Sequence, residues 1–197
     1  RWFQGTADAI HQNLRFIEAT DADFIAIFGG DHIYKMDISQ MVQYHRMNKA
    51  DLTIAVLEVP KEEASRFGIM TVDENFRVQA FEEKPACPVT IPGRPTCCSS
   101  MGNYIFSKDK LMDLLKRGKK MYEDLDFGKH IIPMMLEARD KVYAYAFYDN
   151  TVPGMEPHER GYWRDVGAID AYYEANMDLI SVTPQLNLYN YQWPILT

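Results

Sequence analysis

A short apolar run that stops at two glycines and an aspartate constrains the fold more than any other feature of this sequence. Residues 24–28 (Phe-Ile-Ala-Ile-Phe) are apolar over a length too short for a helix, which predicts a buried β-strand. Gly29 and Gly30 end the strand, and Asp31 follows directly. Open α/β sheets bind ligands at the carboxyl ends of their strands, so Asp31 is a candidate site residue. The alternative is an acid that caps the next helix.

Helical and strand patterns alternate in the first third of the chain. Apolar residues recur at helical spacing in residues 6–19, and residues 38–48 carry a second helical pattern. Residues 52–57 form a second β-rich apolar run, which Pro60 ends. This alternation predicts a parallel sheet with crossover helices.

The remaining elements are predicted by the same rules. Residues 68–72 and 77–81 predict a β-hairpin, whereas the proline-rich residues 87–99 predict a surface loop. The later elements are strands at 100–106 and 142–148, helices at 108–117, 127–138 (kinked at Pro133) and 169–180, and a polar loop at 150–161.

Composition excludes several classes of protein. The 197 residues carry a net charge of -7, which argues against nucleic acid as a partner, since phosphates require a basic surface. No apolar run approaches the roughly 18 residues of a membrane span, and no signal peptide is evident. We interpret the cysteines (Cys87, Cys97 and Cys98) as reduced thiols in a loop, which favours the cytoplasm.

Four short motifs carry candidate chemistry. Gly5 and Thr6 stand at a helix start, which favours a nucleotide or anion, although a simple N-cap explains them equally well. Lys84 follows Glu83 at a strand end and could bind a phosphate, or it could be a solvated surface lysine. Asp31 is the third candidate, and Asp165 is either a second site acid or a helix cap.

Taken together, these motifs suggest a reaction. Asp31 and Asp165 could hold one Mg²⁺ against a nucleoside triphosphate, because magnesium takes few protein carboxylates and completes its shell with phosphate oxygens and water. Lys84 would hold the attacking phosphate, and transfer would then depend mainly on positioning and electrostatics.

Six strings of residues together suggest a known family, and they lie at residues 3–9, 30–37, 67–70, 81–85, 100–102 and 162–167. The second reads Gly-Asp-His-Ile-Tyr-Lys-Met-Asp, the fourth contains Glu-Lys-Pro, and the sixth contains Trp-x-Asp-x-Gly. In order and spacing, across nearly the whole chain, they resemble the bacterial ADP-glucose pyrophosphorylases (glucose-1-phosphate adenylyltransferases). The second string is highly specific to that family, whereas Glu-Lys-Pro and Trp-x-Asp-x-Gly are common to sugar nucleotidyltransferases.

The resemblance implies a fold and a reaction. The fold is α/β, with a Rossmann-like mixed, mostly parallel sheet of the sugar nucleotidyltransferase (GT-A-like) type. The reaction converts ATP and α-D-glucose 1-phosphate to ADP-glucose and pyrophosphate in glycogen biosynthesis. The resemblance further implies a homotetramer that small metabolites regulate.

The resemblance also assigns roles to residues of this chain. Asp31 and Lys84 would be catalytic, and Asp31 and Asp165 would bind Mg²⁺. The remaining roles would be adenine and ribose binding by Phe3, Gly5 and Thr6, and glucose 1-phosphate binding by Gly68, Glu83, Lys84 and Ser100.

Parts of the family pattern are missing from this sequence. The Gly-rich phosphate loop of the first strand would lie upstream of residue 1, and the C-terminal β-helix domain would lie beyond residue 197. We therefore expect residues 1–181 to be a catalytic domain incomplete at its N-terminus, and residues 182–197 to be a connector. An α/β sheet without its first strand has an open edge, so we expect this span alone to be inactive and prone to aggregate.

Three other functions remain open at this stage. A related nucleotidyltransferase could form dTDP- or UDP-glucose instead. A nucleotide-sugar-dependent glycosyltransferase would carry Asp-x-Asp after a strand, whereas Asp21-Ala22-Asp23 precedes one. A non-catalytic regulatory subunit would keep the fold, but it would be expected to lack Asp31 or Lys84, and both are present.

Overall fold

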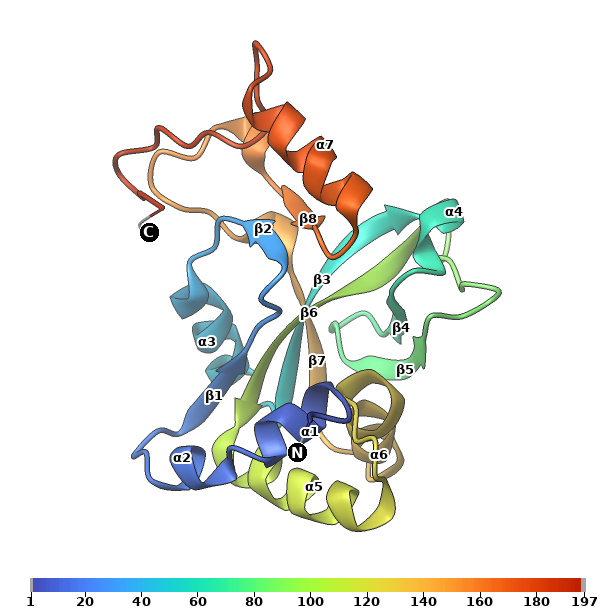
Figure 1. The fold of residues 1–197 in the computed structure, drawn as a ribbon. Helices are drawn as coiled ribbons and strands as arrows, with labels where there is room; N and C mark the ends of the chain where they lie inside the picture. Colours follow the sequence, from blue (N-terminus) through green and yellow to red (C-terminus); the bar gives the residue numbers. More distant parts are fainter. Residues whose placement is uncertain (1, 196–197) are drawn as a thin grey trace.

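The computed structural model describes residues 2–195 and is built around one six-stranded sheet, with a separate two-stranded sheet beside it (Figure 1). The order in the large sheet is β5-β4-β6-β3-β7, and β1 also pairs with β6. The strands of this sheet are β1 (Phe24–Ile27), β3 (Leu52–Pro60), β4 (Gly68–Val72), β5 (Val78–Glu83), β6 (Thr96–Ser107) and β7 (Val142–Ala146). The small sheet consists of β2 (His32–Tyr34) and β8 (Trp163–Asp165).

The predicted α/β fold with a mixed, mostly parallel sheet is confirmed in the sense that most strands of the large sheet run in the same direction. β1, β3, β4 and β7 run one way, and β5 and β6 run the other. Among the described strands, β3 and β7 are the one parallel pair of neighbours, because β6 lies antiparallel between β3 on one side and β1 and β4 on the other. The first strand expected upstream of residue 1 stays a prediction.

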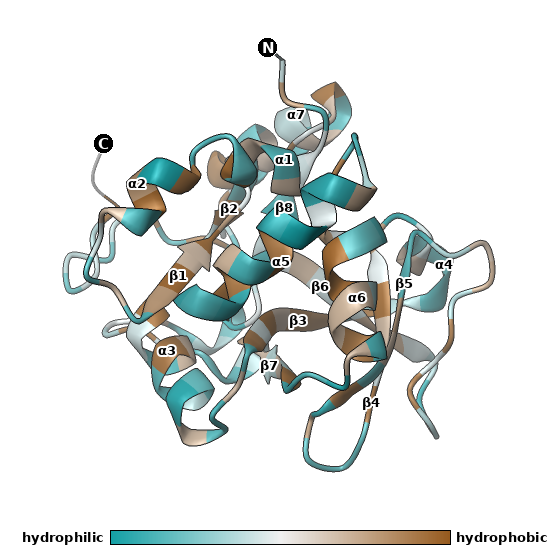
Figure 2. Ribbon diagram, turned by 90° about the horizontal axis from the view of Figure 1, so that it is seen from below, coloured by the Kyte–Doolittle hydropathy of each residue, from teal (hydrophilic) through white to brown (hydrophobic). Residues whose placement is uncertain are grey.

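Helices cover both faces of the large sheet (Figure 1). One apolar core packs α1, α5 and α6 against the sheet, and a second packs α3 and β2 against the opposite face. In Figure 2, α5 presents hydrophilic residues outward while the strands behind it are mostly hydrophobic. The helices are α1 (Thr6–His11), α2 (Leu14–Glu18), α3 (Ile38–Met47), α4 (Lys61–Ala64), α5 (Lys108–Met121), α6 (Ile132–Glu137) and α7 (Ile169–Leu179), with a π-helix η1 (Phe127–Ile131) and 3-10 turns η2 (Phe147–Asp149) and η3 (Pro157–Glu159). Within residues 2–195, no helix is long and apolar enough to cross a membrane.

The single helix predicted over residues 6–19 is wrong, because the chain forms α1 and α2 with a break between them. Asn13 leaves helical geometry at φ -108°, ψ 11°, and its side chain donates to the carbonyl of Ala9 at 2.8 Å. Asparagine readily forms such local bonds, which compete with a continuing helix. The predicted apolar face is nevertheless correct, since Ala7 and Leu14 are buried in the core.

The surface loop predicted for residues 87–99 is wrong at its C-terminal end. β6 begins at Thr96, and both Cys97 and Cys98 are buried within it. Cys98 lies opposite Glu58 of β3 and Met70 of β4, so it occupies the middle of the sheet. All three cysteines are free thiols, as expected, but only Cys87 is exposed.

The helix predicted over residues 127–138 forms, and its first part, η1, is a π-helix that runs directly into α6. The amide of Ile131 donates to the carbonyl of Asp126 five residues earlier, at 3.1 Å. Pro133 lies in the first turn of α6, directly after the π-helix. The residues around the junction keep helical geometry, so the predicted helical segment forms, and Pro133 lies where its hydrogen bonding changes from the π to the α pattern.

The helix predicted for residues 169–180 forms as α7, but its apolar stripe is exposed. Ile169, Tyr172, Tyr173 and Ile180 face solvent, and Ala175 is the buried residue of this helix. The sequence pattern correctly gave the helix and did not specify what the stripe contacts.

A buried histidine joins α3 to the sheet. His45 lies with its Nδ1 2.8 Å from the Thr53 hydroxyl and its Nε2 3.2 Å from the Ser107 hydroxyl. Ser107 donates its hydroxyl hydrogen to the carbonyl of Ala50, so it must accept from Nε2, and Nδ1 then accepts from Thr53. Burial holds the pKa of this imidazole at about 4, so the ring is neutral in the folded protein.

We predict that His45 makes stability depend on pH below neutrality. The unfolded chain takes up a proton near pH 6.5, but the folded protein does so only near pH 4, so this contribution is complete above pH 6.5 and is lost as the pH falls toward 4. Between pH 7.5 and 5.0 the loss should be about 2 kcal/mol. Urea denaturation at the two pH values would measure it. His45→Gln, which keeps a donor and an acceptor but cannot titrate, should lose about 2 kcal/mol less; equal losses would contradict the assignment.

Candidate functional site

The site lies where β6 changes partner along one edge. β4 pairs with Cys98 and Ser99, β1 pairs with β6 from Tyr104 onward, and the residues between have no strand partner on that side in the described part of the chain. Gly102 lies in this gap with φ +74°, a left-handed conformation that glycine adopts without strain. The gap opens the sheet at its middle.

A cavity of about 170 Å³ occupies this gap and is lined by five of the residues predicted from sequence. Phe67 and Trp163 form an aromatic wall, with their ring centroids 5.6 Å apart. A second cavity of about 360 Å³ shares this aromatic wall. The five predicted residues in the first cavity are Gly68, Glu83, Lys84, Ser100 and Asp165.

The small sheet brings the two predicted acids together. β2 and β8 pair antiparallel with His32 opposite Asp165, and Asp31 directly precedes β2. The amide of Val166 donates to the carbonyl of Asp31 at 2.9 Å, and the amide of Gly167 donates to Asp165 Oδ1 at 2.8 Å. Backbone pairing therefore places these two acidic residues, which come from distant parts of the sequence, side by side.

His32 joins the two acids and was not predicted as a site residue. One possible ligand atom from each of Asp31, His32 and Asp165 lies within 4.8 Å of the others. His32 Nε2 is 3.6 Å from Asp31 Oδ1, and its Nδ1 is buried without a hydrogen-bond partner in the described structure. Two carboxylates and an imidazole form a donor set suited to a divalent cation.

Lys84 has a strained backbone at the cavity. Its φ of +49° lies in the left-handed region, which is costly for a residue with a side chain, and its amide donates to the carbonyl of Phe67 at 3.1 Å. The side chain is exposed and lines the cavity. Backbone strain at a cavity residue is typical of functional sites.

Glu83 is half-buried next to Lys84, with its carboxylate against two glycines. A Cβ on Gly128 would lie 2.3 Å from Glu83 Oε2, and a Cβ on Gly68 would lie 3.0 Å from the same oxygen. Burial raises the pKa of this carboxyl and the Asp126 carboxylate raises it further, while Lys84 and Lys129 oppose the rise. No hydrogen bond to the Glu83 side chain occurs in the described structure, so the carboxylate is available to a ligand.

The residues predicted to bind a nucleotide lie outside this cavity, near the start of α1. Gly5 precedes α1, and a Cβ there would lie 2.3 Å from the carbonyl oxygen of Leu125. The Thr6 hydroxyl donates to Asp126 at 2.8 Å and accepts from the amide of Phe127. Phe3 is exposed. Gly5 and Thr6 therefore already have packing roles, and Asp126 connects Thr6 to the surroundings of Glu83.

Comparison with known proteins identifies close relatives. The family described as "Nucleotidyl transferase" matches residues 2–182. A glucose-1-phosphate adenylyltransferase from Trichlorobacter lovleyi is 71% identical over 197 residues, and one from Geobacter metallireducens is 70% identical over 196. A protein named glucose-1-phosphate adenylyltransferase 1 from Vibrio cholerae is 49% identical over 199 residues. Each alignment covers 100% of this chain and 48% of the relative, so the chain spans about half the length of these relatives.

We predict that Gly128→Ala displaces the Glu83 carboxylate, because the new methyl group would lie 2.3 Å from Oε2. The carboxylate should move toward water, and its pKa should fall from its raised position toward the ordinary range. Stability should change by less than about 1 kcal/mol, since alanine favours the helix. NMR titration of the Glu83 carboxyl carbon would measure the pKa. Gly30→Ala is the control, because a Cβ there meets nothing within 4 Å. An unchanged Glu83 pKa in Gly128→Ala would show that the contact is not restrictive.

Proposed function

The chain belongs to the nucleotidyl transferase family, and on that premise we propose that the protein containing it is a glucose-1-phosphate adenylyltransferase. The proposed reaction joins ATP and α-D-glucose 1-phosphate to give ADP-glucose and pyrophosphate. The observation that carries the proposal is the convergence of Lys84, the half-buried Glu83 and Asp165 around one cavity, with Asp31 close to Asp165 at its edge. The names of the relatives, at 71% and 70% identity over this whole chain, support the choice of substrates.

We propose that Asp31 and Asp165 bind Mg²⁺, with His32 beside them. The fit rests on the donor set, since both acids offer oxygen ligands within the 4.8 Å cluster. A bound Mg²⁺ would supply charge neutralisation for the triphosphate. The pairing of β2 with β8 brings the two residues together, and the amide of Gly167 holds the Asp165 carboxylate.

Glucose 1-phosphate is proposed to bind in the cavity at the gap in the sheet. Lys84 would bind its phosphate as a compact positive charge. Glu83 would accept hydrogen bonds from sugar hydroxyls, and Ser100 and Gly68 would line the same pocket. The aromatic wall would pack against the sugar ring.

The nucleotide positions rest on the family resemblance. We propose that Phe3, Gly5 and Thr6 lie at the adenine and ribose, although none of them lines the cavity. The Thr6 hydroxyl donates to Asp126, whose charge acts on Glu83. This contact supports the placement because it brings the start of α1 toward Glu83.

The same resemblance is the basis for what we propose of the whole protein. We propose that it is a homotetramer in the cytoplasm, that small metabolites regulate it, and that it acts in glycogen biosynthesis. The division into a catalytic domain over residues 1–181 and a connector over residues 182–197 also stays a prediction.

We predict that the protein expressed from its complete reading frame releases pyrophosphate from ATP and glucose 1-phosphate in the presence of Mg²⁺. The ratio kcat/KM for ATP should exceed that for dTTP or UTP at least tenfold, about 1.4 kcal/mol of discrimination. Asp31→Asn should lower kcat by a factor of about 100 or more, because it removes a charge that acts on the transition state. A coupled pyrophosphate assay would measure both.

The matched control is Asp21→Asn, which makes the same change at an exposed acid outside the site. Its activity should equal that of the unmodified protein. Pyrophosphate release with dTTP or UTP but not with ATP would show that ATP is not the substrate. Activity of Asp31→Asn equal to that of the unmodified protein would show that Asp31 is not catalytic. Loss of activity in Asp21→Asn would show that the loss in Asp31→Asn is not specific to the proposed site.

A further inference from the structure

One lysine of the Gly-Asp-His-Ile-Tyr-Lys motif has no role in the proposed reaction, yet it is almost completely buried. Lys35 Nζ lies 2.7 Å from Glu159 Oε1, and the two side chains are only 2% and 1% exposed. Neither residue lines the cavity that holds Glu83 and Lys84. Burying two charges is costly unless their geometry and hydrogen bonds compensate, so this pair calls for an explanation.

The pair joins three segments of the chain. Lys35 follows β2, and Glu159 ends the short turn η3. Glu159 also accepts from the amides of Asn187 and Glu156, each at 3.0 Å, and Lys35 donates to the carbonyl of Asn187. Burial by itself raises the pKa of the Glu159 carboxyl, but these hydrogen bonds and the nearby lysine charge lower it below its usual range. The carboxylate is therefore charged and fully bonded.

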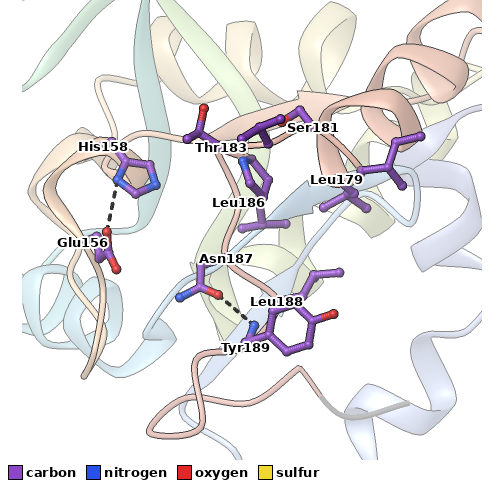
Figure 3. Close-up of a pocket in the computed structure, with 12 residues that line it drawn as sticks. Glu156, His158, Leu179, Ser181, Thr183, Leu186, Asn187, Leu188 and Tyr189 are labelled. Carbon is purple, nitrogen blue, oxygen red and sulfur yellow. Dashed lines mark hydrogen bonds and ion pairs between the residues drawn. The ribbon is translucent and has the colours of Figure 1, made fainter.

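Asn187 lies in the last part of the described chain. The side-chain oxygen of Asn187 accepts from the amide of Tyr189 at 2.8 Å, as Figure 3 shows. Leu186 and Asn190 on either side are buried, and Asn190 donates to the carbonyl of Pro153 at 2.8 Å. This segment, residues 185–190, also borders a cavity of about 570 Å³ that shares no residue with the proposed substrate cavity.

The ion pair and the two metal-site acids lie at opposite ends of the same pair of strands. Asp31 precedes β2 and Lys35 follows it, while Glu159 lies before β8 and Asp165 ends it. Because β2 and β8 are antiparallel, with Tyr34 opposite Trp163, Lys35 and Glu159 meet at one end and the two acids meet at the other. Each strand is only three residues long, so the ion pair and the two acids lie at the ends of one short ladder.

We propose that Lys35 is a positioning residue that couples the docking of residues 185–190 to the spacing of Asp31 and Asp165. The inference rests on the metal assignment in the proposed function. Coupling of this kind is reciprocal: if the docked segment favours the metal-binding spacing, then a bound metal must favour the docked segment to the same degree. A purely structural ion pair would stabilise the fold without this reciprocal effect.

The test measures Mn²⁺ binding and amide exchange in the protein expressed from its complete reading frame. Electron paramagnetic resonance of free Mn²⁺ gives the affinity, and hydrogen–deuterium exchange with and without Mn²⁺ gives the protection of residues 185–190. In the unmodified protein, Mn²⁺ should slow exchange in this segment several-fold. In Lys35→Met, Mn²⁺ should bind about tenfold more weakly and should no longer change the exchange of the segment.

Lys110→Met provides the matched control. Lys110 Nζ lies 2.6 Å from Asp140 Oδ1, and α5, which carries this lysine, lies at the other end of the molecule from β2 and β8 (Figure 1). This variant should keep both the Mn²⁺ affinity and the protection of residues 185–190. Glu159→Gln, which keeps an acceptor but removes the charge, should weaken both effects and provides a milder change if Lys35→Met does not fold.

The outcomes separate this inference from the proposed function. One result would overturn the positioning role and leave the metal site intact. In it, Asp31→Asn abolishes Mn²⁺ binding, whereas Lys35→Met and Glu159→Gln change the Mn²⁺ affinity by less than twofold and leave the protection of residues 185–190 unchanged. Protection of residues 185–190 that does not respond to Mn²⁺ in the unmodified protein would also overturn it. Absence of Mn²⁺ binding in the unmodified protein would overturn both the metal assignment and the inference.

Discussion

The antiparallel pairing of β2 with β8 is the constraint on which the candidate site depends. These two short strands hold Asp31 and Asp165 near each other, together with His32, within a 4.8 Å cluster of possible ligand atoms. Repulsion between two carboxylates at that separation is on the order of 1 kcal/mol when water screens it, which backbone hydrogen bonds can offset. A divalent cation would turn this repulsion into attraction, which is the basis of the proposed metal site.

The same pairing sits at the edge of an opening in the large sheet. β6 exchanges β4 for β1 as its neighbour, and the residues in between line the cavity with Glu83 and Lys84. The cavity is therefore a consequence of sheet topology, because two different strands share one edge of β6 and neither covers its middle. Lys84 holds a left-handed backbone there, and close contacts with Gly68 and Gly128 surround the carboxylate of Glu83.

How far the sequence predicts the structure depends on the length of each element. Long periodic segments such as α3 and α5 were predicted within a few residues. Asp31, Lys84 and Asp165 could be named as candidates because they stand in short, distinctive strings. β2 and β8 are three residues each, too short for an alternating pattern, so the pairing of His32 with Asp165 and the contact of Lys35 with Glu159 could not be predicted. Cys97 and Cys98 were misplaced because the prolines before them obscured the start of β6.

The account's central claim is that the β2–β8 pairing forms a single metal site from Asp31 and Asp165. The most direct measurement is anomalous diffraction from crystals of the complete protein grown with Mn²⁺ and ATP. The account predicts an anomalous peak within roughly 2.5 Å of a carboxylate oxygen from each acid. A peak bound by only one of them, or located away from the β2–β8 pair, would contradict it.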